Sequence, residues 1–232
     1  MKPRRWPRAA LLVVALSVGA STMALAEERK TSAVAAQEAG AKGWTALFNG
    51  KDLDGWKFHL GKGDDNKGTF TVKDGILICT GKPNGYMYTD KSYSTYKLEC
   101  DFAFKRPEGL TDDSKFLGNS GVLIHVGQKN AMGVWPRSIE VQGMNRDLGI
   151  ILPIPRSVKC KRTFAKETML KVRKPVGEYN RIEIVVNRGE MVIKLNGTVV
   201  STVGDCELTE GAIGIQSEGA ETHWKSIRIW EK

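Results

Sequence analysis

The chain has 232 residues, of which 41% are hydrophobic and 26% are charged, with 25 glycines and 8 prolines. This is the composition of an ordinary globular protein, and it excludes a collagen-like, a disordered or a membrane-rich chain. The 35 basic residues outnumber the 26 acidic ones, which gives a formal net charge of +9.

Residues 1–26 follow the order of a cleavable signal peptide. Basic residues precede an apolar run from Ala9 to Ala20, and Ala24-Leu25-Ala26 supplies the small residues of a cleavage site. We therefore expect export to the periplasm or the extracellular space. Cleavage removes four bases and no acid, which leaves 31 bases against 26 acids. No later run approaches the roughly 20 apolar residues of a membrane helix, so we expect no integral membrane segment.

Residues 27–43 lack aromatic residues and a sustained apolar period, and they predict a flexible linker. From Trp44 on, short β-branched and aromatic runs alternate with turn dipeptides such as Asn196-Gly197. Helical periodicity is nearly absent. This pattern predicts an all-β fold, a single antiparallel β-sandwich domain of jelly-roll type over residues 44–232. The expected strands are 45–48, 56–59, 69–73, 76–80, 96–105, 120–126, 137–144, 181–187, 190–195, 198–203, 211–217 and 224–230.

The span 145–180 is a long, basic excursion between these strands. It contains three prolines and too few alternating positions for regular strand throughout. Loops of this length in compact domains are usually functional, so we expect it at the rim of a binding site. Its bases indicate a solvated loop rather than a nucleic-acid partner, since no recognition motif accompanies them, and an anionic polysaccharide fits them equally well. They are Arg156, Lys159, Lys161, Arg162, Lys166, Lys171, Arg173 and Lys174.

Four cysteines occupy positions 79, 100, 160 and 206. In an oxidising compartment, none, one or two disulfides are possible, and the sequence does not choose among three pairings. Cys79 and Cys100 each lie in an apolar strand-like run, so buried free thiols are an equal alternative.

Strand alternation sorts the polar side chains, because residues two apart emerge on the same face. Ile139 and Val141 point one way, which leaves Glu140 and Gln142 on the other face. By the same rule, Gln216 and Glu218 lie on the face of their strand away from Ile213 and Ile215. His125 likewise lies on the face of its strand away from Ile124. Trp135 and Arg137 precede Glu140, and Trp224 follows Glu218. Aromatic platforms beside carboxylates and amides are typical of sugar sites, so we expect one concave carbohydrate pocket.

Five segments, taken in order and spacing, resemble the 3-keto-disaccharide hydrolase domain family over about residues 44–231. They are LFNGKDLDGW at 47–56, NSGV at 119–122, WPRSIEVQ at 135–142, GIQSEG at 214–219 and IRI at 227–229. The resemblance implies a concanavalin-like or laminarinase-like β-sandwich and an activity that releases sugars from glycosides oxidised at C3. The basic excursion and its Cys160 lie outside these motifs.

A ketone at C3 acidifies the hydrogen on C2, so a base can remove it and expel the group on C1, after which water adds back. Such an elimination needs a base, an acid and a partner for the enolate oxygen. We expect His125, Glu140 and Glu218 to be the catalytic groups, and we expect sugar contacts from Trp135, Arg137, Gln142, Gln216 and Trp224.

Other interpretations stay open at this point. A divalent metal held by His125 and a carboxylate would polarise the ketone, although the sequence requires no cofactor. Direct hydrolysis by Glu140 and Glu218 is a third route. A non-catalytic, lectin-like sandwich would use the same face to bind sugar. The sugar, the linkage and the oligomeric state do not follow from the sequence.

Overall fold

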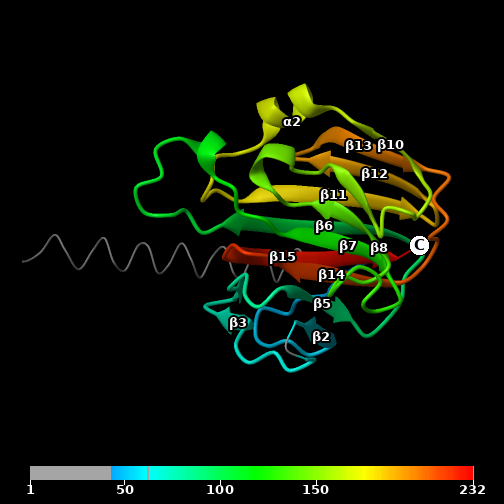
Figure 1. Cartoon of the computed structure of the whole chain (residues 1–232), viewed down its shortest axis with the longest axis horizontal. Helices are drawn as coiled ribbons and strands as arrows, with labels where there is room; N and C mark the ends of the chain where they lie inside the picture. Colours follow the sequence, from blue (N-terminus) through cyan, green and yellow to red (C-terminus); the bar gives the residue numbers. More distant parts are fainter. Residues whose placement is uncertain (1–42, 62, 232) are drawn as a thin grey trace, which may run out of the picture. The chain divides into compact units, whose positions relative to one another are not determined.

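The computed structural model describes residues 43–61 and 63–231. The predicted signal peptide and the predicted linker up to residue 42 lie outside these residues. The described strands form two antiparallel sheets, one of nine strands and one of six. Figure 1 shows the strands of these sheets running side by side. The predicted all-β sandwich is therefore confirmed.

The nine-stranded sheet has the order β10-β13-β12-β11-β6-β15-β4-β3, and β1 pairs with β15 beside this path. Its strands are β1 (Trp44–Ala46), β3 (Phe70–Lys73), β4 (Ile76–Cys79), β6 (Thr95–Phe104), β10 (Lys161–Phe164), β11 (Asn180–Asn187), β12 (Glu190–Leu195), β13 (Thr198–Gly204) and β15 (Thr222–Glu231).

The six-stranded sheet has the order β2-β5-β14-β7-β8-β9. Its strands are β2 (Trp56–Leu60), β5 (Gly85–Thr89), β7 (Gly121–Val126), β8 (Ser138–Gln142), β9 (Ile151–Ile154) and β14 (Ala212–Ser217). Among the described residues, three short helices lie in the connections, namely η1 (Asp113–Lys115), η2 (Asn145–Asp147) and α2 (Lys166–Val172).

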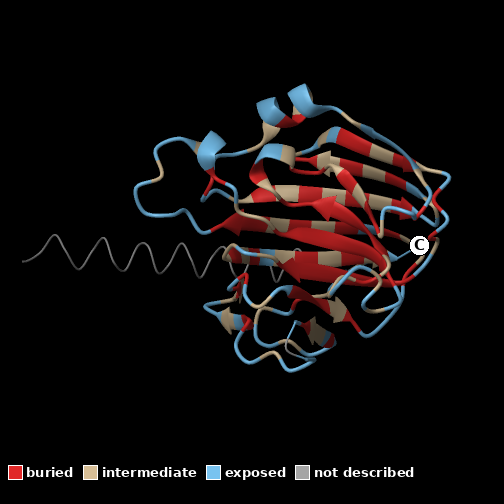
Figure 2. Ribbon diagram, in the orientation of Figure 1, coloured by how far each residue is buried: buried red, intermediate tan, exposed pale blue. Residues whose placement is uncertain are grey.

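The core contains the side chains that the two sheets turn toward each other, and Figure 2 shows the central strands as mostly buried. Burial of a large aliphatic or aromatic side chain contributes about 1.5–3 kcal/mol, so these positions supply most of the stabilising free energy. The smaller sheet contributes Val122, Ile124, Ile139, Val141, Ile213 and Ile215, and the larger sheet contributes Leu98, Cys100, Phe102, Ile184, Ile193 and Ile227. The odd-even alternation predicted for β8 and β14 is what this core requires.

Each of the twelve predicted strands overlaps an observed one, while β5, β9 and β10 were not expected. β5 reads Gly-Tyr-Met-Tyr-Thr, whose only β-branched residue is Thr89, and it shows no clear alternation of apolar and polar residues. β9 contains Pro153, which an edge strand tolerates because one side of it needs no N–H donors. The predicted irregular excursion therefore contains an edge strand of each sheet, since β9 ends the smaller sheet and β10 ends the larger one.

All four cysteines have free thiols in the structure, and Cys79, Cys100 and Cys206 are buried. Burial raises the pKa of the Cys79 thiol, which makes this group unreactive. Within residues 43–61 and 63–231, no helix is long and apolar enough to cross a bilayer.

Candidate active site

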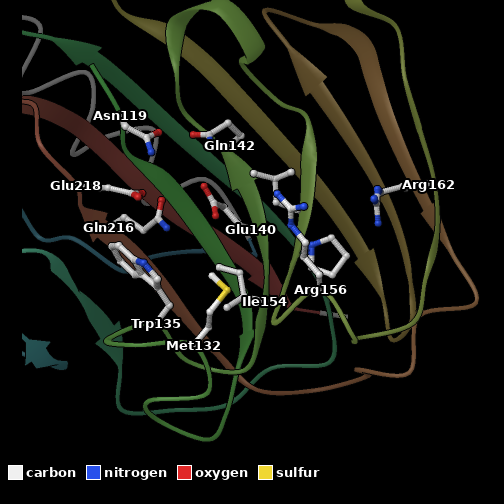
Figure 3. Close-up of a pocket in the computed structure, with 12 residues that line it drawn as sticks. Asn119, Met132, Trp135, Glu140, Gln142, Ile154, Arg156, Arg162, Gln216 and Glu218 are labelled. Carbon is white, nitrogen blue, oxygen red and sulfur yellow. The ribbon is translucent and has the colours of Figure 1, made fainter. Parts of the chain in front are cut away.

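A cavity of about 490 Å³ opens on the outer face of the six-stranded sheet. This volume is in the range of small-molecule binding sites. The side chains that line it come from β8, β9, β10, β14 and the loops around them, and Figure 3 shows them around one hollow. They are Asn119, Met132, Trp135, Glu140, Gln142, Leu152, Pro153, Ile154, Arg156, Arg162, Gln216 and Glu218.

Strand register explains why polar groups converge on this face. Glu140 lies opposite Leu123 of β7 and Leu152 of β9, and Gln142 lies opposite Gly121. Because Gly121 has no side chain, the groups from β8 and β14 can approach each other above it. A Cβ at this glycine would lie 2.5 Å from Gln216 Oε1 and 3.2 Å from Glu140 Oε1. Gly121 therefore leaves the space in which the carboxyl and the amide meet.

Glu140 is the most deeply buried carboxyl group of the pocket, and its side chain is 5% exposed. Its Oε1 atom has no hydrogen-bond partner. Burial, reinforced by the charge of Glu218 and opposed by the Gln216 amide, raises the pKa of Glu140 to about 8. A carboxyl group with this pKa is mostly protonated at neutral pH, so it can donate a proton.

Glu218 follows the end of β14, is partly buried, and forms a backbone bridge with Asn119. Burial raises the pKa of this carboxyl group to about 6, and the Asn119 side chain partly offsets the effect. Glu218 is thus mostly ionised at neutral pH while Glu140 is mostly neutral. Two carboxyl groups with separated pKa values are the arrangement that supplies an acid and a base to one substrate.

Two buried amides accompany the carboxyl groups. Gln142 is held in place because its Oε1 accepts a hydrogen bond of 2.8 Å from the backbone N–H of Met144. Gln216 is 1% exposed, and its Oε1 has no partner. The Tyr86 hydroxyl, on the neighbouring strand in register with Gln216, is also buried without a partner. Buried polar atoms are normally hydrogen-bonded, so unpaired atoms on this face indicate a place for a polar ligand.

Trp135 forms an aromatic wall of the pocket. Its backbone exchanges two hydrogen bonds with Met132, which closes a tight turn in the loop between β7 and β8. Its ring packs against the apolar cluster that Tyr86, Leu123 and Ile154 form on the same face. The indole is only partly buried, so a flat apolar surface remains beside the polar groups, as sugar binding requires.

The model of the 3-keto-alpha-glucoside-1,2-lyase-like domain matches residues 43–230. The chain belongs to this family. A search of curated proteins found no match.

Among solved structures, a candidate glycosyl hydrolase from Parabacteroides distasonis is 22% identical, with a TM-score of 0.61 over 84% of this chain and 97% of the other. A carbohydrate-binding module from Bacillus subtilis is 12% identical, with a TM-score of 0.53 over 77% and 96% of the chains. The β-glucanase of Bacillus licheniformis is 10% identical, with a TM-score of 0.50 over 82% and 97%. At these identities, the likeness shows a shared sandwich fold.

The pocket of this 3-keto-alpha-glucoside-1,2-lyase-like domain brings together five of the eight predicted site residues. Glu140, Gln142, Gln216, Glu218 and Trp135 all line it. Asn119, Met132, Arg156 and Arg162 also line the pocket and were not among the predicted site residues. Arg156 and Arg162 belong to the basic excursion, whose predicted position at the rim of a site agrees with the lining. Their positive charge in a long loop was the signal that could have identified them.

The predicted position of His125 in this pocket is wrong. Between Leu123 and Val126, β7 has one residue more than β14, and His125 adopts a positive φ of 56° at this bulge. The bulge reverses the alternation, so Val126 joins the outer face instead. The His125 side chain is 1% exposed, and its Nε2 donates a 2.9 Å hydrogen bond to the carbonyl of Arg188 in the β11–β12 turn. Burial lowers the pKa of this imidazole.

Trp224 and Arg137 do not line the pocket either. Trp224 lies on β15, in the other sheet, where it is 1% exposed and stacks on Phe102 with the ring centres 5.0 Å apart. Its Nε1 donates to Thr222 Oγ1. Arg137 precedes β8 and forms a 2.7 Å ion pair with Glu207. Trp224 is therefore a core residue, and Arg137 is a surface ion-pair partner.

The alternative in which His125 and a carboxylate of the pocket hold a metal is not supported, because the His125 side chain bonds to Arg188 and does not line the pocket that Glu140 lines. In the described part of the chain, no group of three or more histidine, cysteine, aspartate or glutamate side chains is arranged to hold a metal ion.

Proposed function

We propose that this domain cleaves the glycosidic bond of 3-keto-glycosides or 3-keto-disaccharides by elimination followed by hydration. One observation carries the proposal. Two carboxyl groups line a single pocket, and their surroundings hold their pKa values apart, at about 8 for Glu140 and about 6 for Glu218. Membership of the 3-keto-alpha-glucoside-1,2-lyase-like family supports the same substrate class.

In the elimination step, the Glu218 carboxylate removes the proton from C2, which the neighbouring C3 ketone acidifies. The electron pair forms a C1–C2 double bond as the bond between C1 and the glycosidic oxygen breaks. Protonated Glu140 donates its proton to that oxygen. In the hydration step, water adds to C1 and Glu140 takes up its proton, while protonated Glu218 returns a proton to C2. Both carboxyl groups therefore finish the cycle as they began it.

The remaining side chains bind and orient the sugar in this proposal. The amide N–H groups of Gln142 and Gln216 stabilise the negative charge that develops on the C3 oxygen, as donors directed at a developing oxyanion do. The partly exposed face of Trp135 stacks on the sugar ring. Since Trp135 touches the ring equally before and during the reaction, its loss should raise KM more than it lowers kcat.

We also propose that the protein acts outside the cytoplasm, in the periplasm or the extracellular space. The support is the succession of bases, apolar run and small residues within positions 1–26. N-terminal sequencing of the protein recovered outside the cytoplasm should begin at Glu27. A sequence that begins at Met1 would contradict export by this route.

The activity is tested by incubating the purified protein with a disaccharide and with the same disaccharide oxidised at C3, each with and without a chelator. We expect free sugar from the 3-keto substrate alone. Release from the unoxidised disaccharide would instead favour direct hydrolysis by the two carboxyl groups. If neither is cleaved, but both bind and Trp135→Ala abolishes binding, the domain is a lectin-like module. The arm with chelator reports whether a metal takes part.

A further inference from the structure

Two arginines of the basic excursion, Arg156 and Arg162, line the pocket without a charged partner. Arg156 follows β9 and Arg162 lies on β10, and both side chains are exposed. Neither makes a hydrogen bond or an ion pair within the described residues. By contrast, Arg137 and Arg146 each pair with a nearby acid. Two guanidinium groups without an acidic partner at one end of a pocket can bind an anion.

The charge balance of the pocket favours an anion at this end. Glu140 is mostly neutral at pH 7, so Glu218 supplies the only carboxylate charge of the lining, against two permanent positive charges. Arg162 also borders a second cavity that Glu190 shares. The Glu190 carboxylate forms no ion pair with Arg162, and it accepts a 2.9 Å hydrogen bond from the backbone N–H of Asp205.

The arginines and the ionised carboxylate lie at different ends of the cavity. Figure 3 shows Arg156 and Arg162 on the side away from Asn119 and Glu218, with Glu140 between the two groups. A sugar that places C2 near Glu218 would therefore direct its far substituents, or its neighbouring sugar unit, toward the arginines. Guanidinium groups bind carboxylate and sulfate oxygens with paired, charge-assisted hydrogen bonds.

We propose that Arg156 and Arg162 form a subsite for an oxyanion carried by the sugar, either the carboxylate of a uronic acid or a sulfate ester. This inference rests on the proposed function, because it assumes that the pocket holds a sugar. It adds to that function a substrate class, the acidic saccharides, and it gives the basic excursion a binding role.

The test compares binding by isothermal titration calorimetry at low ionic strength. The probes are a neutral disaccharide, the same disaccharide with one uronic acid unit, and the same disaccharide with one sulfate ester. A charge-assisted contact contributes about 1.5–3 kcal/mol, so we expect the wild-type protein to bind an acidic probe about 10- to 100-fold more tightly than the neutral one.

The double variant Arg156→Ala/Arg162→Ala should lose this preference and keep its affinity for the neutral probe. Lys159→Ala is the matched control, because Lys159 lies between the two arginines and is exposed but does not line the pocket. It should keep most of the preference. Thermal unfolding of the double variant checks its fold, and little change is expected from truncating exposed side chains.

The possible outcomes separate this inference from the proposed function. A preference for one acidic probe identifies its oxyanion, and a preference for both supports a general oxyanion subsite. Equal affinity for the neutral and acidic probes overturns the subsite and leaves the sugar pocket intact. An equal loss of preference in Lys159→Ala also overturns it, since the effect would then be general surface charge. If no probe binds, the subsite is overturned, whereas the proposed function is decided separately by cleavage of the 3-keto disaccharide.

Discussion

The negative charge of Glu218 helps to raise the pKa of Glu140, so the ionisation of one carboxyl group of the pocket affects the protonation of the other. Burial is the larger cause, and the charge adds to it because a second negative charge nearby disfavours ionisation. The result is a neutral acid beside an ionised one near pH 7. The proposed acid–base chemistry depends on this difference in protonation.

The first prediction concerns the pH dependence of kcat/KM on a 3-keto disaccharide. Activity should rise as Glu218 loses its proton through about pH 6, and it should fall as Glu140 loses its proton through about pH 8. A bell-shaped profile with a maximum near pH 7 follows, since kcat/KM reports the ionisations of the free enzyme. An activity that still increases above pH 9 would show that no protonated carboxyl group is needed.

The second prediction concerns stability and needs no substrate. The pKa of Glu140 is raised in the folded state, so its contribution to stability is full below the unfolded-state pKa near 4.5 and is lost as pH rises through about 8. Glutamine does not ionise, so Glu140→Gln removes this pH-dependent loss of stability. The variant should therefore gain stability over the wild type from pH 5 to pH 8, by an amount on the order of a few kcal/mol.

Melting temperatures measured across this pH range check the second prediction. Glu108→Gln is the control, because Glu108 is exposed in the loop after β6 and should follow the wild-type curve. Parallel curves for wild type and Glu140→Gln would mean that the carboxyl group ionises at its ordinary pKa.

The third prediction concerns the space above Gly121. In Gly121→Ala, the new methyl group would meet Gln216 Oε1 at 2.5 Å and the Val141 carbonyl oxygen at 3.0 Å. We expect at least a tenfold loss of activity, because Gln216 must move away from Glu140, and a stability loss of about 1–3 kcal/mol from overpacking. Gly127→Ala is the control, since its methyl group would make only an ordinary 3.7 Å contact. Equal activity in both variants would contradict the convergence described here.

Much of the fold could be predicted from the sequence, because glycine turns and alternating apolar residues specify short antiparallel strands locally. The same alternation correctly brought Glu140, Gln142, Gln216 and Glu218 to one face. It failed at His125, where one extra residue in β7 reverses the phase, and no residue in the sequence marks that bulge. The predicted sugar contact of Trp224 was wrong for another reason. A tryptophan on a strand can pack into the core as readily as it can contact a sugar, and the alternation does not distinguish the two.

The fourth prediction follows from the position of His125. His125→Asn should lower stability by about 1–3 kcal/mol, because it removes a buried side chain and leaves the Arg188 carbonyl without its donor. Asparagine is chosen because it tolerates the positive φ at this position. The kcat/KM profile should keep its shape and both its pKa values. A lost ionisation in that profile would restore His125 as a catalytic group.

The central claim is that Glu140 donates the proton to the leaving oxygen, and the most direct measurement is kcat of Glu140→Gln on a 3-keto disaccharide. Glutamine has nearly the same shape but carries no transferable acid proton. We expect kcat to be at least about a hundredfold lower, with sugar affinity within a few fold of wild type, while Glu108→Gln stays unchanged. A Glu140→Gln protein with near wild-type kcat would show that Glu140 is not the proton donor and would leave Glu218 as the carboxyl group to examine.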